Sequence, residues 1–389
     1  MDSKNRKFNI GRISGACILA VFIIVLDILF VAFPKKTFSE NENRYLQAFP
    51  VPSAESIVSG KWMDDINSYL CDHFPFRDSF MTIRTGVEKA EGRSEINGIY
   101  ICSDGYFIEP YDEPKNTEKT IRIFKSFYES LPENINTELM LVPTAIWTLK
   151  DKLPAAAPYR DQQSDAMDII NGTGIPAVDC FAALSEAYEN ADAASSGAQT
   201  ELYYKTDHHW TTYGAYIGYK AYCEKSGIDA VPLEKWNSTA VSTDFHGTIY
   251  SKLNDYTVPG DTIEAYSLGS DDISVVYEDT HEESDSLYNP EYLGQKDKYS
   301  YFLDNLHSLI TVTNENAGTD RSLVLIKDSY ANCMVPFLSH HFKHIYVFDT
   351  RSYKLGPSAF IAEHPEVTDV LILYNMNMID TDLGIGGIY

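Results

Sequence analysis

The sequence lacks the cysteine patterns that mark disulfide frameworks and zinc sites. Its 389 residues include six cysteines; Cys17 lies in an apolar run, and the other five are scattered with no Cys-x-x-Cys pair. A zinc site is therefore not expected. Five cysteines outside the apolar run do not support a disulfide framework, and they leave one or two individual bridges open.

Basic residues are also scarce. The 31 Lys and Arg residues face 56 Asp and Glu residues, which gives a net charge of −25. Such a surface repels nucleic acid and gains nothing from anionic lipid, so we expect no nucleic-acid partner. The charge fits a neutral or cationic envelope polymer or another protein as partner, and it equally serves solubility alone.

Only one long hydrophobic run is present, at residues 15–33, and basic residues precede it. Its length matches a bilayer core, and the basic flank favours a cytoplasmic N-terminus. We therefore expect a single-pass helix in the cell membrane, with the rest of the chain extracellular. A cleaved signal peptide is the alternative, but the run is long for that purpose and no small-x-small cleavage site precedes Pro34.

The remainder has the composition of a folded protein, with 44% hydrophobic and 13% aromatic residues. Apolar runs that alternate with helical periodicity predict an α/β fold with a mostly parallel sheet. The expected strands are 139–142, 177–180, a pair around 261–278, 323–326, 344–348 and 370–374, and the expected helices are 116–131, 161–171 and 215–225.

Three regions follow from these patterns. Residues 1–34 form the cytoplasmic N-terminus and anchor, 35–95 a juxtamembrane arm and helical segment, and 96–389 the α/β domain. An insertion at about 231–320 interrupts that domain, and we place it at the mouth of the site. In the helical segment, Asp72 and Arg77 are expected to form a structural ion pair.

Two distant motifs carry the chemistry. Thr206-Asp207-His208-His209-Trp210 supplies a carboxylate and an imidazole, and an extended backbone would place Asp207 and His209 on one face. Ser329 follows the buried run 323–326, so it should lie at the C-terminal edge of the sheet, where open α/β sheets bind ligands. A serine, a base and a carboxylate that orients the base are the parts of a nucleophilic site.

Simpler interpretations of these motifs stay open. His208 and His209 suit a metal poorly, because adjacent side chains point apart on a helix or a strand. Asp207 and His209 are also compatible with a structural ion pair, and an Asp-Ser pair after a strand is often only a helix cap.

The motifs resemble those of a known family. TDHHW and KDSY, together with Glu42-Asn43-Arg44, the DHFPFR run from Asp72 to Arg77, and FHGT at 245–248, resemble the DHHW family of bacterial envelope proteins. That family is related to the alginate O-acetylation proteins of the SGNH-hydrolase superfamily. The resemblance implies an SGNH-like three-layer α/β/α fold, Ser329 as nucleophile, His209 as general base and Asp207 as its orienter.

The sequence departs from the superfamily at one point, because Lys327 stands where ordinary SGNH enzymes carry glycine, and separate Gly and Asn blocks for the oxyanion hole are not identifiable. Arg351, just past a strand end, is a candidate for contact with a substrate oxygen; a surface or structural ion-pair arginine is the alternative. The other substrate or oxyanion candidates are His208, Trp210, Tyr330, Tyr374 and Asn375.

The resemblance implies acetyl transfer to an envelope polysaccharide through an acyl-serine, with a multi-span membrane acyltransferase as acetyl donor and no cofactor. A deacetylase of the same kind of polymer and a catalytically inactive carbohydrate-binding scaffold are the alternatives. A close approach of Ser329, His209 and Asp207 in an open cleft would favour an enzyme, and a scattered set would favour the scaffold.

Overall fold

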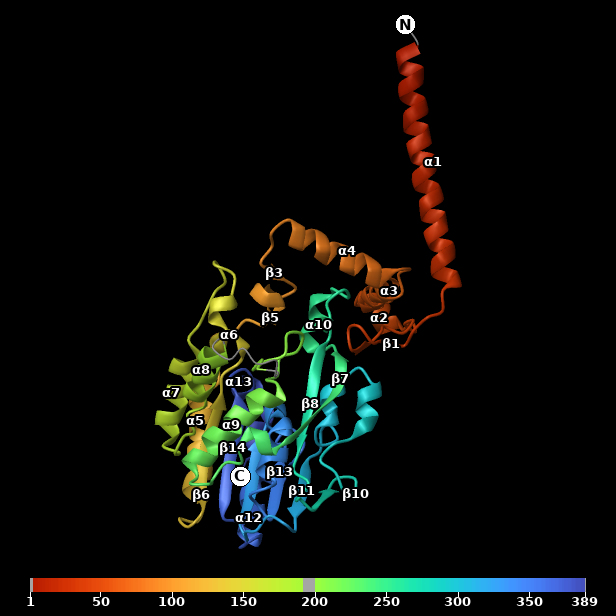
Figure 1. Cartoon of the computed structure of the whole chain (residues 1–389). Coiled ribbons are helices and arrows are strands. Elements are labelled where there is room, and N and C mark those ends of the chain that lie inside the picture. The colour runs from red at the N-terminus through yellow and green to blue at the C-terminus, as the bar shows by residue number, and fades with distance from the viewer. Residues whose placement is uncertain (1–2, 192–199, 389) are drawn as a thin grey trace. The chain divides into compact units, whose positions relative to one another are not determined.

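In the computed structural model, most of the apolar runs of the sequence lie side by side in one seven-stranded sheet (Figure 1). The strand order is β10-β9-β11-β13-β12-β14-β6. The bounds in chain order are β6 (Asn136–Val142), β9 (Ile273–Tyr277), β10 (Glu282–Ser284), β11 (Leu309–Asn314), β12 (Ser322–Lys327), β13 (His344–Phe348) and β14 (Asp369–Asn375).

The structure describes residues 3–191 and 200–388. The chain divides into two compact units. Unit 1 consists of Met1–Glu91 and Asn254–Thr257, and unit 2, which holds the large sheet, consists of Gly92–Leu253 and Val258–Tyr389.

The large sheet is mixed, which corrects the expectation of a mostly parallel sheet. β12 runs parallel to β13 and β14, and β14 runs parallel to β6. β11, however, is antiparallel to both β13 and β9, and β10 is antiparallel to β9. Antiparallel neighbours need no helical crossover, so the alternation of strands and helices does not reveal them. The α/β class itself is confirmed.

The centre of the sheet explains where Ser329 lies. All six residues of β12 are buried, as a central strand covered on both faces requires. Ile326 lies opposite Phe348 of β13, and Lys327 lies opposite Leu373 of β14. The parallel strands therefore end at a common edge, and the chain reaches Ser329 two residues beyond β12.

Helices pack along the sheet, α5 against α7 and α8 against α9 (Figure 1). On α5 the apolar side chains at Ile123, Phe124 and Phe127 are buried at helical spacing, as the sequence predicts. The helices of unit 2 are α5 (Thr117–Ser130), α6 (Ala145–Thr148), α7 (Gln162–Thr173), α8 (Cys180–Ala191), α9 (Thr212–Lys225), α10 (Thr248–Leu253), α11 (Val335–Leu338), α12 (Pro357–Glu363) and α13 (Met378–Thr381).

Smaller elements complete unit 2. β3 (Glu95–Ile96), β4 (Ile99–Ile101) and β5 (Phe107–Ile108) form a three-stranded sheet, and β7 (Asn237–Phe245) pairs with β8 (Asp261–Ser267). Short 3₁₀ helices are η1 (Ser103–Gly105), η2 (Lys150–Lys152), η3 (Leu233–Lys235), η4 (Pro290–Gly294), η5 (Lys298–Tyr301), η6 (Ser329–Cys333) and η7 (Leu383–Gly387).

Two strand predictions are wrong in detail. The expected strand at 177–180 is reduced to one bridge from Ala177 to Leu139, because Asp179 accepts a hydrogen bond from Ala182 N (3.0 Å) and starts α8 at Cys180. The pair around 261–278 exists as β8 and β9, but they do not pair with each other. β8 pairs with β7, and β9 with β11 and β10.

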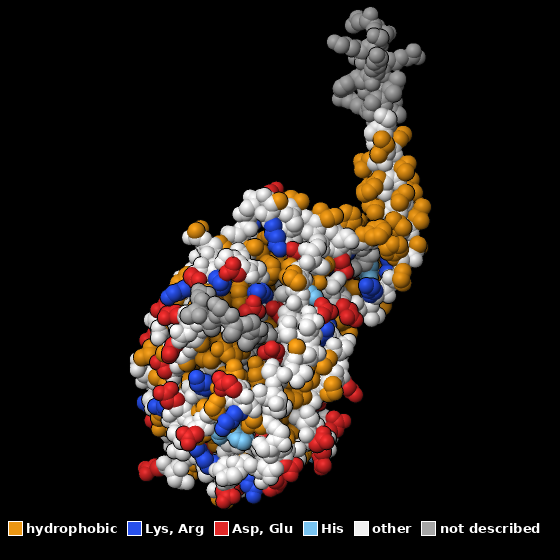
Figure 2. All heavy atoms as spheres, viewed as in Figure 1, with side chains coloured by type: hydrophobic (Ala, Val, Ile, Leu, Met, Phe, Trp, Pro, Cys, Tyr) orange, Lys and Arg blue, Asp and Glu red, His pale blue; other side chains and the backbone are white. Residues whose placement is uncertain are grey.

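Unit 1 begins with helix α1 (Ser3–Ala32). Its segment Ser14–Ala32 is long and apolar enough to cross a membrane, and none of it is buried in the protein. Figure 2 shows hydrophobic side chains along this part of the helix. The single N-terminal apolar helix is consistent with a membrane anchor.

The rest of unit 1 is mainly helical, as predicted, with β1 (Phe38–Ser39), β2 (Arg44–Tyr45), α2 (Ala54–Val58), α3 (Lys61–Asp72) and α4 (Arg77–Ala90). The ion pair expected between Asp72 and Arg77 does not form as such. Asp72 pairs with Arg44 (2.5 Å), and Arg77 pairs with Glu42 (2.6 Å). The charged residues of the ENR and DHFPFR motifs therefore tie the arm to the helices.

All six cysteines lie in the described part of the chain and are free thiols. Cys180, Cys223 and Cys333 are buried, and burial raises the pKa of Cys333 to about 12. The bridges that the sequence left open are not formed.

Candidate active site

Ser329 sits on a tight turn that Asp328 holds in place. The Asp328 carboxylate accepts hydrogen bonds from Tyr330 N (2.8 Å), Asn375 N (2.7 Å) and Asn375 Nδ2 (2.7 Å). Burial raises the pKa of Asp328 to about 6, despite these donors. Ser329 itself is half-buried and opens η6 at the carboxyl edge of the parallel strands.

The DHHW segment forms a tight loop and not the extended run that the sequence suggested. Tyr203 pairs with Trp210 across its base, and Tyr204 N donates to His209 O (3.2 Å). Asp207 Oδ1 accepts from His209 N (3.1 Å), the local bond by which an aspartate shapes a turn. His208 therefore does not point away; its ring lies 3.9 Å from that of His209.

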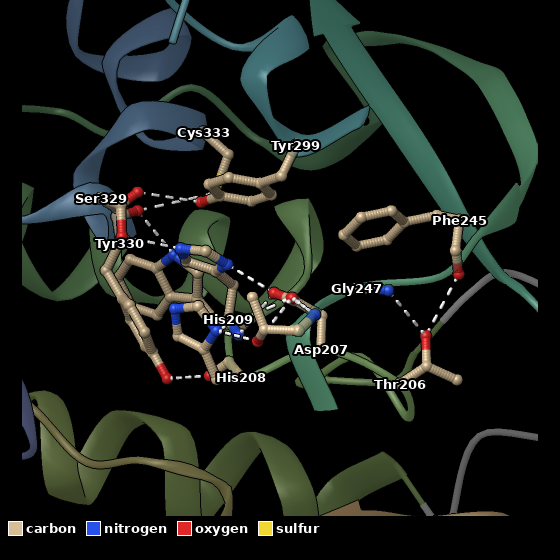
Figure 3. A network of polar contacts seen from close by, with 12 residues as sticks. Thr206, Asp207, His208, His209, Phe245, Gly247, Tyr299, Ser329, Tyr330 and Cys333 are labelled. Carbon is tan, nitrogen blue, oxygen red and sulfur yellow. Dashed lines mark hydrogen bonds and ion pairs between the residues drawn. The ribbon is translucent and has the colours of Figure 1, made fainter. Parts of the chain in front are cut away.

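The structure brings the three predicted residues into hydrogen-bond contact (Figure 3). His209 Nδ1 lies 2.5 Å from Asp207 Oδ1, and His209 Nε2 lies 2.7 Å from Ser329 Oγ. An ionised carboxylate only accepts, so Nδ1 carries the proton and Nε2 is free to accept the serine proton. This is the tautomer that a general base requires.

The FHGT motif positions the carboxylate. Asp207 Oδ2 accepts hydrogen bonds from Thr248 N (2.8 Å) and Thr248 Oγ1 (3.2 Å). Gly247 permits this approach, because a Cβ atom there would lie 2.1 Å from Asp207 Oδ2. Sequence reasoning gave the motif no role in the site, since the contact joins positions 41 residues apart.

Asp261 anchors the start of the same loop. Its carboxylate accepts from Lys205 N (2.9 Å), Thr206 N (2.8 Å) and Thr206 Oγ1 (2.6 Å). Burial raises the pKa of Asp261. The sequence marks it only as the first residue of β8, so its role is visible only in the fold.

Tyr299 is the second residue that sequence reasoning missed. Its ring stacks on the His209 ring, with centroids 3.7 Å apart and an interplanar angle of 11° (Figure 3). Its hydroxyl donates to Ser329 O (3.1 Å) and lies 3.2 Å from Cys333 Sγ. Tyr299 thus contacts both the base and the nucleophile. No motif near it in the sequence indicates this role.

Burial determines the charge states of Asp207 and His209. Burial lowers the pKa of His209, and His208 lowers it further, whereas the attraction of Asp207 opposes both effects. Burial alone would raise the pKa of Asp207, but the two imidazoles and the Thr248 N–H outweigh it and lower that pKa. A neutral imidazole beside a carboxylate is the resting state of a general base.

Three of the other sequence candidates hold the site. Trp210 and Tyr330 are fully buried; Trp210 Nε1 donates to Tyr330 O (2.8 Å), and the Tyr330 hydroxyl donates to His208 O. The His208 side chain is 31% exposed, and its Nδ1 lies 2.6 Å from Thr248 Oγ1. Among these three, only His208 is open to a substrate.

The remaining candidates belong to the strand ends beside Ser329. The side-chain amide of Asn375 donates to Asp328, and the buried hydroxyl of Tyr374 lies 2.9 Å from Thr350 Oγ1. Arg351 binds Asp349 through Nε (2.8 Å) and Nη2 (2.5 Å) while one third of its side chain stays exposed.

Lys327, at the position of the expected glycine, is buried with its Nζ 3.6 Å from Asp349 Oδ2. Arg351 binds the same carboxylate. Burial lowers the pKa of Lys327, and the attraction of Asp349 opposes that effect. Lys327, which replaces the glycine expected from the resemblance, is thus accommodated by an acidic partner.

Asp207, His208 and His209 also meet the geometric requirement for a metal site, with one ligand atom from each within 4.8 Å of the others. Three of the four ring nitrogens, however, already have protein partners. His209 uses Nδ1 for Asp207 and Nε2 for Ser329, and His208 Nδ1 contacts Thr248. The arrangement therefore fits nucleophile activation better than metal ligation.

The sequence matches the DHHW protein family over residues 139–348, a range that contains the DHHW loop, the FHGT motif and Ser329. The chain belongs to the DHHW family. The resemblance carried by the motifs is thereby confirmed.

One solved structure supports the DHHW assignment, and a second shares the fold. A DHHW family protein from Eubacterium siraeum is 25% identical, with a TM-score of 0.64 over 75% of this chain and 95% of the other. PatB1 of Bacillus cereus, solved with a sulfonyl adduct, is 18% identical, with a TM-score of 0.59 over 75% of this chain and 100% of the other.

The O-acetyltransferase domain of Pseudomonas putida AlgJ is 11% identical, with a TM-score of 0.44 over 73% of this chain and 93% of the other. A comparison with curated proteins finds no match.

Proposed function

We propose that this DHHW protein is a membrane-anchored, extracellular serine acyltransferase that O-acetylates a cell-envelope polysaccharide. The observation that carries the proposal is the 2.7 Å contact between Ser329 Oγ and His209 Nε2, with Asp207 behind the ring. A serine hydroxyl becomes a useful nucleophile when a positioned base removes its proton. The family's relation to alginate O-acetylation proteins supports acetyl as the group transferred.

The first half-reaction loads the serine. Ser329 Oγ attacks the carbonyl carbon of an acetyl ester, and its proton passes to His209 Nε2. Asp207 stabilises the imidazolium through Nδ1–H. The tetrahedral intermediate collapses, the donor alcohol leaves with the proton from His209, and acetyl-Ser329 remains. Arg351, partly exposed at the same edge, is the candidate for contact with the carbonyl oxygen.

The second half-reaction removes the acetyl group from Ser329. A sugar hydroxyl gives its proton to His209 and attacks the acetyl carbonyl, and Ser329 recovers the proton as the sugar ester departs. Water in place of the sugar gives the deacetylase chemistry. Which acceptor reacts depends on how well it is held and how well water is kept out. The stacked Tyr299 covers one face of the base.

Location and partner follow from the N-terminal helix. The positively charged flank of the apolar segment supports a cytoplasmic N-terminus and an extracellular site. An acetyl group activated inside the cell must then cross the membrane, so a multi-span membrane acyltransferase is the proposed donor. The hydrogen-bonded set of Ser329, His209 and Asp207 argues against a purely carbohydrate-binding scaffold.

The test is turnover of para-nitrophenyl acetate by the full chain, with and without neutral oligosaccharides, and with products identified by mass spectrometry. Ser329→Ala should lower the rate by at least about 10,000-fold, because removal of a triad nucleophile costs up to about a million-fold. Ser270→Ala, at an exposed serine, is the matched control and should retain activity.

Acetylated sugar supports transfer, and acetate alone supports the deacetylase. An unchanged rate in Ser329→Ala would disprove the serine mechanism.

A further inference from the structure

Helix α4 exposes an apolar stripe. Phe76, Phe80, Ile83 and Val87 are 53%, 48%, 61% and 52% exposed. Phe76 is the N-cap of α4, and the intervals of four, three and four residues place all four side chains on one side of the helix.

The opposite side of α4 is the one that packs, and it is polar. Thr85 there is only 1% exposed. The contacts on this side are Asn41 Nδ2 to Asp78 Oδ2 (2.8 Å), Tyr256 N to Thr82 Oγ1 (3.4 Å) and Lys89 Nζ to Asp255 Oδ2 (2.6 Å). A water-exposed helix buries its apolar side and presents its polar side to solvent. On α4 this order is reversed, so its apolar side requires an apolar cover.

The stripe begins where the apolar segment of α1 ends. Phe33 directly follows the segment Ser14–Ala32, and its ring contacts that of Phe76 edge to face at 5.3 Å. One turn earlier in α1, Phe30 contacts Tyr69 at 6.1 Å. Aromatic side chains gather where a spanning helix leaves the bilayer, and amphipathic helices lie at that depth.

The size of the stripe also favours lipid over protein. A helix of 14 residues is about 21 Å long, and a stripe about 10 Å wide then covers roughly 200 Å². A stable protein interface buries about 800 Å² on each partner, several times more. A bilayer interface has no such minimum.

We propose that α4 lies in the membrane interface, with Phe76, Phe80, Ile83 and Val87 inserted among the lipid acyl chains. The inference rests on the proposed membrane anchor and adds a second contact to it. Two contacts fix the orientation of unit 1 on the membrane, where one spanning helix alone would let it turn.

Spin labels on the full chain in phosphatidylcholine and phosphatidylglycerol vesicles test this. Cys17, Cys71 and Cys102 are first replaced by serine, because the other three cysteines are buried. A nitroxide is then attached at Ile83→Cys, or at Gly86→Cys as the matched control. Gly86 is exposed on the same helix, about 60° around the axis from Ile83 and about 100° from Val87, and a side chain there meets nothing within 4 Å. Glu129→Cys on α5, whose side chain is 64% exposed, gives the water reference.

We expect the label at 83 to be several-fold more accessible to oxygen than to a water-soluble nickel chelate. The ratio of oxygen accessibility to nickel accessibility should be lower at 86 and lower still at 129. Equal nickel accessibility at 83 and 129 would overturn the proposal. So would exclusion of both reagents at 83, the sign of a protein cover such as a second copy or a partner. Flotation of the chain with the vesicles is measured separately, so failure of the anchor is distinguished from failure of the stripe.

Discussion

Gly247→Ala perturbs the candidate site without changing any of its functional groups. The added methyl carbon would lie 2.1 Å from Oδ2, 2.3 Å from Cβ and 2.4 Å from Cγ of Asp207. Ordinary contacts are about 3.5 Å, so the carboxylate or the FHGT loop must move by roughly 1 Å. Either movement weakens the hydrogen bond from Thr248 N to Asp207 and turns the carboxylate away from His209.

Two magnitudes follow from this geometry. A misplacement of about 1 Å in a catalytic group costs about 100-fold in rate. Overpacking costs about 1–3 kcal/mol of stability, and a weakened hydrogen bond to a charged group adds up to about 2 kcal/mol. We therefore expect ester turnover to fall about 100-fold and the free energy of unfolding to fall by about 1–5 kcal/mol.

The assay pairs para-nitrophenyl acetate turnover with urea denaturation, at a temperature where the variant is fully folded. Gly269→Ala is the control, because a side chain there meets nothing within 4 Å and the change should stay within about 0.5 kcal/mol. If Gly247→Ala matches the wild type in both rate and stability, the FHGT loop does not hold Asp207 as described.

Three further predictions concern the base and its surroundings. Asp207→Asn should lower turnover by about 10,000-fold, because the amide cannot stabilise the imidazolium, and a loss below tenfold would count against its orienting role. Burial lowers the pKa of His209, so the neutral base should persist as pH falls below about 6.5, with activity lost only at lower pH; an inflection above that value in the rate profile would contradict this. Tyr299→Phe should cost about 1 kcal/mol of stability and keep the pH profile, whereas Tyr299→Leu should move the acidic limb upward as water reaches the ring; identical profiles for the two variants would exclude a role for stacking.

The parts that sequence could predict are those that local patterns encode. The fully apolar run of β12 and the helical spacing of α5 determine their elements without outside help. The meeting of Asp207, His209 and Ser329 was predictable because two motifs matched a known family. The three residues lie in contact although 120 positions separate base and nucleophile.

The parts that sequence could not predict depend on distant partners. Asp261 and Tyr299 serve the site through bonds to segments 55 and 30 residues away, and nothing in their own neighbourhoods shows it. β11 pairs antiparallel with β9 and β13 without a crossover helix. The alternation of strands and helices in the sequence therefore does not predict that the sheet is mixed. Asp207 and His209 come together through a turn and not through strand alternation, so the predicted contact was right for a different physical reason.

The central claim is that Ser329 carries the acetyl group during turnover. Rapid acid quenching of the full chain with para-nitrophenyl acetate, followed by peptide mass spectrometry, tests it directly. The account predicts one acetyl group on the peptide that contains Ser329 and no acetyl group on that peptide in Ser329→Ala. In the Gly247→Ala variant the acetylated peptide accumulates if transfer from Ser329 slows more than acetylation of Ser329. Continued turnover with no acetyl on Ser329, or with the acetyl on another residue, would contradict it.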